Sequence, residues 1–228
     1  MRQHTGKVTE IRGDSQGMTA WIACPPEAVP KAGQFLSAYA PGDESQALAS
    51  QVFAAELGAN GFLAAPPVPT SWLPGTRLNL YGPLGSGFHL GTGMHRLAVA
   101  APGNTPARLL PLIPQGLAQG ADITFLADCP LPALPTPVEV SPLSALPDIL
   151  GWADFLAMEL TPATLPNLRR LLGLRPGDHL PFAAQALIAT AMPCAGLADC
   201  GACAILGRGG WKLACKDGPV FNLDELEW

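Results

Sequence analysis

Four of the six cysteines in this chain of 228 residues lie in one short stretch near its C-terminal end. They are Cys194, Cys200, Cys203 and Cys215, separated by five, two and eleven residues. A [2Fe–2S] cluster needs four thiolates, and plant-type ferredoxins supply them with a C-x4-C-x2-C run and a distant fourth cysteine. The spacing here has one extra residue in the first gap. It predicts that these four cysteines bind a [2Fe–2S] cluster.

Small residues surround the cysteines, namely Gly196, Ala198, Gly201 and Ala202. They allow the backbone to wrap closely, so that its N–H groups point at the sulfurs and tune the reduction potential. A structural zinc site is the alternative for four cysteines, but it usually pairs two C-x2–4-C knuckles. Only one such knuckle is present, and the zinc alternative stays open.

Composition narrows the function classes. Hydrophobic residues make up 48% of the chain, charged residues 14%, and the net charge is −5 without a basic run. This pattern argues against nucleic acid or an anionic membrane as a partner. No apolar run approaches the ~18 residues of a membrane span, and the N-terminal residues lack the apolar core of a secretory signal. We therefore expect a cytoplasmic protein, in which clustered cysteines serve metal or redox chemistry before disulfides. Cys24 and Cys129 are isolated and are expected to be small core residues.

Three regions must position these cysteines. Residues 1–93 contain short alternating segments separated by turns, which predict an antiparallel β-barrel. Residues 94–190 alternate strand-like and helix-like segments, which predict a Rossmann-like α/β domain with a parallel sheet. Residues 191–228 are rich in Gly and Cys and are expected to form a loop-like cluster segment with one hairpin.

The α/β region can be divided further. Strands are expected at 96–101, 121–127 and 185–190, and helices at 106–113, 143–150 and 165–172. The stretch 152–158 fits either a strand or the end of a helix.

Two stretches carry a specific resemblance. Residues 192–203 read MPCAGLADCGAC and residues 211–221 read WKLACKDGPVF, while residues 82–88 read GPLGSGF. Together with LPGTRL at 73–78 and the Gly-Gln-Phe that ends at Phe35, they resemble the electron-transfer subunit of type B dihydroorotate dehydrogenase, a ferredoxin-reductase-like family.

The resemblance implies a β-barrel FAD domain, a Rossmann-like pyridine-nucleotide domain and a C-terminal [2Fe–2S] segment. In the family, electrons pass from NADH to FAD and through the cluster to the flavin of a catalytic partner that acts on dihydroorotate. It therefore implies a hetero-oligomer with a flavoprotein or another oxidoreductase subunit.

The chain departs from the family's FAD motifs. The family has Arg-Pro-x-Ser on a barrel strand, where the Arg meets a flavin phosphate. Residues 46–52 read QALASQV, with neither Arg nor Pro. The family's Gly-x-Gly-Thr is replaced by Pro67-Val68-Pro69-Thr70, and prolines lack the N–H that a pyrophosphate needs. Thr70 and Ser71 are the nearest residues that could hold FAD. Tyr39 and Tyr81 either stack on a flavin or pack at the barrel rim.

The nucleotide loop departs as well. The family has a Gly-Gly-Gly-x-Gly loop after the first sheet strand, where glycines let phosphate approach the backbone. Residues 101–106 contain a single glycine, Gly103. They are expected to form a tight turn, with Thr105 capping a helix and Pro106 at its first position. This argues against NAD binding.

Three functions follow from these observations. The first is a one-electron relay that keeps the cluster and has lost one or both organic cofactors. The second is a self-contained reductase that binds FAD and NADH, and the third is a non-redox module with a structural zinc. For the relay, the loop 194–203 is expected to lie at an apolar, lightly charged face that meets the partner near Leu197.

Overall fold

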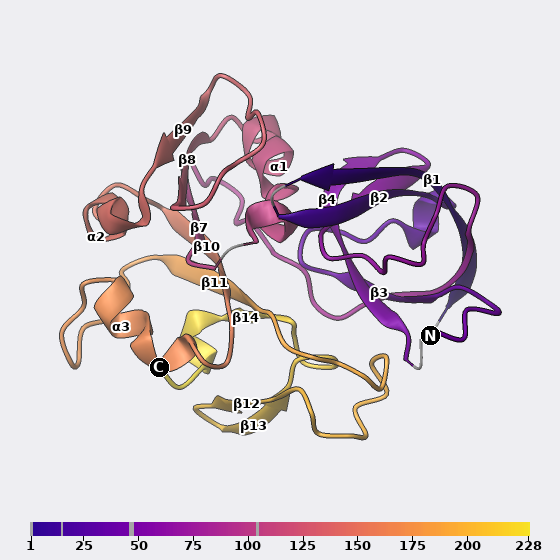
Figure 1. The fold of residues 1–228 in the computed structure, drawn as a ribbon. Helices are drawn as coiled ribbons and strands as arrows, with labels where there is room; N and C mark the ends of the chain where they lie inside the picture. The colour runs from indigo at the N-terminus through magenta and orange to yellow at the C-terminus, as the bar shows by residue number, and fades with distance from the viewer. Residues whose placement is uncertain (1, 15, 46–47, 104) are drawn as a thin grey trace.

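The computed structural model describes every residue except 1, 15, 46–47 and 104. A closed barrel lies beside an α/β sheet, and a two-stranded hairpin lies apart from both (Figure 1). The predicted fold class is confirmed. No helix in the described part of the chain has the length and apolar character needed to cross a membrane.

The barrel is antiparallel throughout, in the order β1-β2-β5-β4-β3-β6. Alternate side chains point inward along each strand, so Ile22, Leu36, Phe62 and Leu80 are fully buried with Trp72. A short 3-10 helix, η1 (Pro26–Ala28), follows the second strand. The strands are β1 (Gln3–Asp14), β2 (Gly17–Ala23), β3 (Phe35–Tyr39), β4 (Ser50–Gly58), β5 (Gly61–Ala64) and β6 (Arg77–Leu84).

The second sheet has the order β14-β11-β10-β7-β8-β9. Its strands are parallel except β14, which pairs antiparallel with β11. The central strands are buried on both faces, which explains their continuous apolar sequences. The strands are β7 (Arg96–Ala101), β8 (Asp122–Ala127), β9 (Val138–Ser141), β10 (Phe155–Leu160), β11 (Ala183–Ile188) and β14 (Val220–Asn222).

Two strands of this sheet were not predicted. β9 is short and partly exposed, so it lacks the buried apolar run that marks the central strands. β14 belongs to the cluster segment, which is therefore built into the sheet and is not only a loop with a hairpin. The open question at 152–158 is resolved in favour of a strand, β10.

The helical regions are less regular than predicted. The expected helix at 106–113 is split into η2 (Pro106–Leu109) and α1 (Leu112–Ala118), because Pro111 lacks the N–H that a continuous helix requires. The other two regions each begin as a 3-10 turn and end as one α-helical turn. They comprise η3 (Leu143–Ala145) with α2 (Leu146–Ile149) and η4 (Leu165–Asn167) with α3 (Leu168–Leu171).

The motifs that carry the resemblance meet in space. Gln34 Nε2 donates to the Gly85 carbonyl at 3.1 Å. Ser86 N–H donates to the Gly218 carbonyl at 2.6 Å, and Val220 N–H donates to the Ser86 carbonyl at 3.4 Å. The exit of the barrel is thus bonded through its backbone to the cluster segment.

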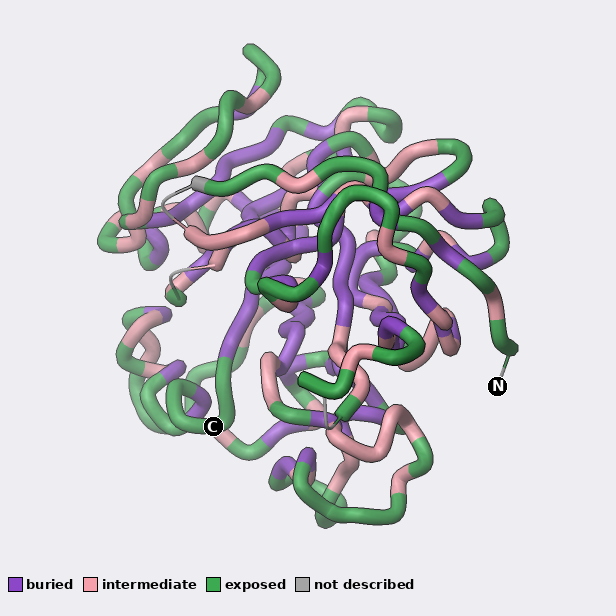
Figure 2. Tube along the Cα trace, turned by 45° about the vertical axis from the view of Figure 1, so that its right-hand side comes forward, coloured by how far each residue is buried: buried purple, intermediate pink, exposed green. Residues whose placement is uncertain are grey.

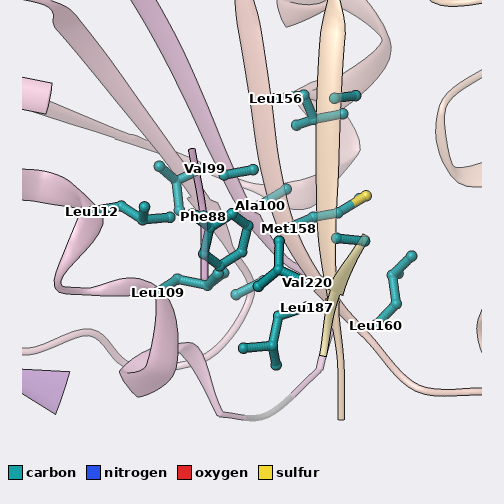
Figure 3. Packing of buried hydrophobic residues seen from close by; sticks show 14 of the residues in the cluster. Phe88, Val99, Ala100, Leu109, Leu112, Leu156, Met158, Leu160, Leu187 and Val220 are labelled. Carbon is teal, nitrogen blue, oxygen red and sulfur yellow. The ribbon is translucent and has the colours of Figure 1, made fainter. Parts of the chain in front are cut away.

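Buried side chains continue this contact into the α/β core. Phe88, which follows the barrel, lies among Met158, Leu187 and Val220 from three strands of the sheet (Figure 3). One buried apolar cluster includes these residues together with Phe53 of the barrel. Figure 2 shows the buried strands at the centre of the molecule and exposed segments around them.

The C-terminal tail packs on the chain itself. η5 (Leu223–Glu225) precedes Trp228, whose ring lies 4.7 Å from the guanidinium carbon of Arg169 on α3. Trp228 Nε1 donates to the Leu223 carbonyl at 2.6 Å.

Replacing Gly85 with alanine should detach the cluster segment. Gly85 has φ 74°, and an added Cβ would lie 2.5 Å from the Gly218 oxygen and from Pro219 Cδ. We expect Gly85→Ala to lower the free energy of unfolding by about 2–4 kcal/mol, from left-handed strain plus overpacking. The variant should also lose bound iron, measured by denaturant unfolding and metal analysis.

Gly93→Ala is the matched control. Gly93 has φ 84° with nothing within 4 Å of an added Cβ. It should show only the conformational cost of about 1–2 kcal/mol and keep its iron. Equal effects of the two substitutions would contradict the importance of the contact.

Candidate iron–sulfur cluster site

A β-hairpin brings two of the four cysteines together. Cys203 precedes β12 (Ala204–Gly207) and Cys215 follows β13 (Gly210–Leu213). Because the strands pair antiparallel, with Ala204 opposite Leu213, both cysteines lie at the open end of the hairpin. The Cys215 N–H donates to Cys203 Sγ at 3.5 Å.

The other two cysteines form a second pair in the loop after β11. The Cys194 sulfur accepts hydrogen bonds from the backbone N–H groups of Asp199, Cys200 and Ala198, and it contacts the Cys200 thiol. These donors, led by Asp199, lower the pKa of Cys194 to about 6. At neutral pH the Cys194 sulfur is therefore mostly thiolate, the form that binds metal.

The loop needs unusual backbone conformations to aim these donors. Ala195 and Ala198 have φ 51° and 61°, in the left-handed region, as do Gly196 and Gly201 at 84° and 69°. Left-handed conformations of non-glycine residues cost roughly 1–3 kcal/mol and cluster at ligand clamps. Successive N–H groups turned to one side form an anion-binding concavity, which here faces the Cys194 sulfur.

The two pairs lie in different environments but near each other. Cys203 and Cys215 are 1% and 3% exposed, whereas Cys194 is half-buried and Cys200 is exposed. Burial, with the neighbouring Cys203, raises the pKa of Cys215 to about 12, and the charge of Cys194 also contributes. The thiols are therefore grouped two and two, as the two irons of a binuclear cluster require.

In the described part of the chain, no group of three or more His, Cys, Asp or Glu side chains is arranged to hold one metal ion. The donor chemistry is thiolate only, which suits soft metals and iron–sulfur clusters.

Exposed apolar side chains occur in the same segment as the cysteines. Leu197, in the cluster loop, is 69% exposed. Leu206 and Trp211 face each other across the hairpin and are 48% and 73% exposed. This pair was not predicted from the sequence. The signal was the alternation along β12, where Ile205 is buried and Leu206 therefore points to the opposite face.

The remaining cysteines lie elsewhere. Cys24 is 8% exposed in the barrel core, and burial raises its pKa to about 11. Cys129 follows β8, with its sulfur 4.0 Å from the Gly103 carbonyl. Neither thiol belongs to the site.

The candidate flavin residues lie close to an acidic side chain. Thr70 and Ser71 lie on an exposed turn. Ser71 contacts the Asp43 carboxylate, whose pKa is lowered by hydrogen bonds from Ser45 and Ser71. A negative charge at that turn disfavours a pyrophosphate. Of the stretch that replaces Arg-Pro-x-Ser, Gln46 and Ala47 lie outside the described residues.

Tyr39 and Tyr81 stack on each other. Their ring centroids are 6.1 Å apart at an interplanar angle of 11°. Asn79 Nδ2 donates to the Tyr39 hydroxyl at 2.9 Å. The structure thus shows the two rings packing together on the outside of the barrel.

The loop after β7 differs in one respect from its prediction. Pro106 does occupy the first position of η2, but Thr105 makes no side-chain cap. Its Oγ1 instead donates to Glu159 on β10 at 3.1 Å. The capping prediction for Thr105 is therefore wrong, because a buried carboxylate competes for the hydroxyl. Asn104 of this loop lies outside the described residues.

The C-terminal residues match a known family model, the iron-sulfur cluster binding domain of dihydroorotate dehydrogenase B, over residues 190–227. Residues 190–227 are thus similar to the iron–sulfur cluster binding domains of that family. The predicted resemblance to the electron-transfer subunits of dihydroorotate dehydrogenase B is confirmed. Curated protein sequences contain no match to the chain.

Solved structures extend the likeness to the whole fold. A structure of an NADH-dependent reduced ferredoxin-NADP oxidoreductase, described for flavin-based electron bifurcation, is 17% identical, with 98% of this chain and 90% of that chain covered and a TM-score of 0.73. The ferredoxin reductase in carbazole 1,9a-dioxygenase, in its FAD apo form, is 19% identical, with coverage of 75% and 61% and a TM-score of 0.55.

A third likeness comes from the FAD/NAD binding domain of nitric oxide dioxygenase from Vibrio cholerae. It is 14% identical, with coverage of 82% and 99% and a TM-score of 0.54. At such identities these likenesses establish a ferredoxin-reductase-like fold. Together with the match of residues 190–227 to an iron–sulfur cluster binding domain, this fold supports electron transfer.

Substituting the clustered cysteines should remove the metal. We expect Cys200→Ser to lower bound iron and sulfide at least severalfold, because serine does not replace a thiolate toward iron. Cys129→Ser is the control and should keep its full iron content. Iron and sulfide analysis with a visible spectrum would measure both. Equal losses in the two variants would contradict the assignment.

Proposed function

We propose that this protein is an electron relay that carries electrons through a [2Fe–2S] cluster to or from a partner oxidoreductase. The observation that supports the proposal best is the arrangement of four thiols as two adjacent pairs. In this proposal Cys194 and Cys200 ligate one iron, and Cys203 and Cys215 ligate the other. The cluster, when bound, supplies one-electron oxidation and reduction.

The chain's own residues set the conditions for that transfer. Backbone N–H groups of Ala198, Asp199 and Cys200 disperse negative charge from the Cys194 sulfur, which favours the reduced state. The buried pair Cys203 and Cys215 excludes water on the inner side. The exposed Cys200 lies on the outer side, where electrons pass to the partner.

Each of the three regions of the chain has a separate role in this proposal. The barrel (1–93) and the α/β domain (94–190) form the scaffold, and residues 191–228 hold the cluster. The relay, in preference to a reductase, is supported by prolines at 67 and 69, the carboxylate beside Ser71 and the single glycine after β7.

A self-contained FAD- and NADH-dependent reductase is the second candidate. It is favoured by the ferredoxin-reductase-like fold, whose solved examples include proteins named for FAD or FAD/NAD binding. A zinc module is the third, supported by the cysteine count alone.

The partner we propose is a flavoprotein or another oxidoreductase subunit in a hetero-oligomer. Leu197 on the cluster loop and the pair Leu206 and Trp211 provide exposed apolar area beside the cysteines. Apolar side chains grouped beside a redox centre suit a protein surface better than solvent.

Anaerobic purification with analysis of iron, sulfide, zinc and flavin tests the proposal. The relay predicts about two irons and about two sulfides per chain, no flavin, and bleaching of the spectrum by dithionite but not by NADH. About one flavin per chain with NADH-dependent bleaching would replace the relay by the reductase. Zinc without sulfide would end both redox proposals.

A charge at Leu197 should impair docking but not cluster assembly. We expect Leu197→Glu to slow electron transfer from a dihydroorotate-reduced catalytic subunit of type B dihydroorotate dehydrogenase by about tenfold, since a buried unpaired charge costs more than about 1.4 kcal/mol. Stopped-flow absorbance of the cluster would measure the rate.

Leu73→Glu is its control, because Leu73 is 62% exposed on the barrel side of the chain. It should leave the rate unchanged, and neither variant should alter reoxidation by ferricyanide, a small acceptor. Loss of the cluster in Leu197→Glu, or equal slowing in both variants, would count against the docking role.

A further inference from the structure

A buried carboxylate lies at the carboxyl end of the central strand β10. Glu159 is 6% exposed. Its Oε1 accepts hydrogen bonds from Arg108 Nη1 at 2.8 Å and from Thr105 Oγ1 at 3.1 Å. Both donors come from the segment that follows the neighbouring parallel strand β7.

This carboxylate lies where the order of the strands in the sheet changes direction. From β7 the chain proceeds outward through β8 and β9, whereas from β10 it proceeds in the opposite direction to β11. Strands β7 and β10 therefore flank the topological switch point. In open α/β sheets, ligands bind outside the carboxyl ends of the strands at such a point, and the loop after the first strand receives phosphate.

Arg108 and Thr105, which donate to Glu159, are side chains of the types that bind phosphate in other proteins. An arginine and a hydroxyl converge on one oxygen, as they would on a phosphate oxygen. The Arg108 side chain is 18% exposed, and its guanidinium carbon lies 4.9 Å from the Phe53 ring centroid, on barrel strand β4. The barrel thus closes the position from the other side.

The carboxylate fits its surroundings incompletely. Glu159 Oε2 is buried and has no hydrogen-bond partner among the described residues. Burial raises the pKa of Glu159 although Arg108 and Thr105 oppose the shift. An unsatisfied buried acceptor lowers the stability of a folded protein by about 1–3 kcal/mol. Stability alone therefore does not explain the presence of Glu159 at this position.

We propose that Glu159 occupies the phosphate position of the switch point, so that Arg108 and Thr105 hold an internal carboxylate in place of a phosphate or phosphoester ligand. The α/β domain is then closed to pyridine nucleotides by its own side chain and serves as a scaffold. This inference goes beyond the relay and does not depend on electron transfer by the cluster.

Removing the carboxylate should uncover the anion site. We expect Glu159→Ala to bind inorganic phosphate and pyrophosphate at least tenfold more tightly than the unmodified protein, in titration calorimetry at constant ionic strength. The double variant Glu159→Ala, Arg108→Ala should return to the weak binding of the unmodified protein. Cluster absorbance reports folding in each case and separates this test from that of the relay.

Asp154→Ala is the matched control. Asp154 pairs with Arg96 at 2.7 Å at the opposite ends of the same two strands, away from the switch point. Its loss also frees an arginine between β7 and β10, yet it should create no phosphate site. Equal phosphate binding by Asp154→Ala and Glu159→Ala would overturn the inference, as would strong phosphate binding by the unmodified protein.

Thermal unfolding covers the case in which Glu159→Ala is too unstable for calorimetry. A ligand that binds only the folded state raises its melting temperature. Phosphate should raise the melting temperature of Glu159→Ala and of Glu159→Ser more than chloride does at equal ionic strength. The absence of a phosphate-specific rise in both variants would refute the proposal.

Discussion

The cluster segment depends on one backbone contact, in which the Ser86 N–H donates to the Gly218 carbonyl at 2.6 Å. The two backbone segments approach so closely that no side chain fits at Gly85. Val220 continues the contact into β14. The segment between β11 and β14 is therefore fixed at both ends, by the sheet on one side and by the barrel on the other. Its loop can then hold strained conformations at Ala195 and Ala198 that a free loop would relax.

The site divides into an inner and an outer half. The inner pair, Cys203 and Cys215, is positioned by hairpin pairing and shielded from water, and burial raises the pKa of Cys215. The outer pair is positioned by a loop whose backbone donors already stabilise the Cys194 thiolate. Metal binding releases the protons of protonated thiols, so Cys215, whose pKa is raised, is expected to release more proton than Cys194, whose pKa is lowered.

If Glu159 fills the phosphate position, as we propose, the α/β domain keeps a ligand-binding fold without its ligand. Its strand order and its switch point are those of ligand-binding sheets, yet the apolar cluster that joins it to the barrel is continuous. Arg108 contacts both Phe53 and Glu159, so the same side chain that would meet a phosphate joins the two parts of the molecule. The domain's retained role is then to orient the barrel and the cluster segment relative to each other.

The sequence by itself determined the barrel, most strands of the parallel sheet and the iron–sulfur resemblance of the segment 191–228. These features are local: alternation marks strands such as β3, apolar runs mark β7, and cysteine spacing marks the cluster segment. The sequence could not show that β14 joins the sheet, that Thr105 bonds Glu159, or that Leu206 and Trp211 form one exposed pair. Each of these depends on residues far apart in the chain or on which face of a strand is covered. Only the tertiary structure decides such contacts, because the energy that fixes them comes from packing between elements and not from the conformational preference of any one segment.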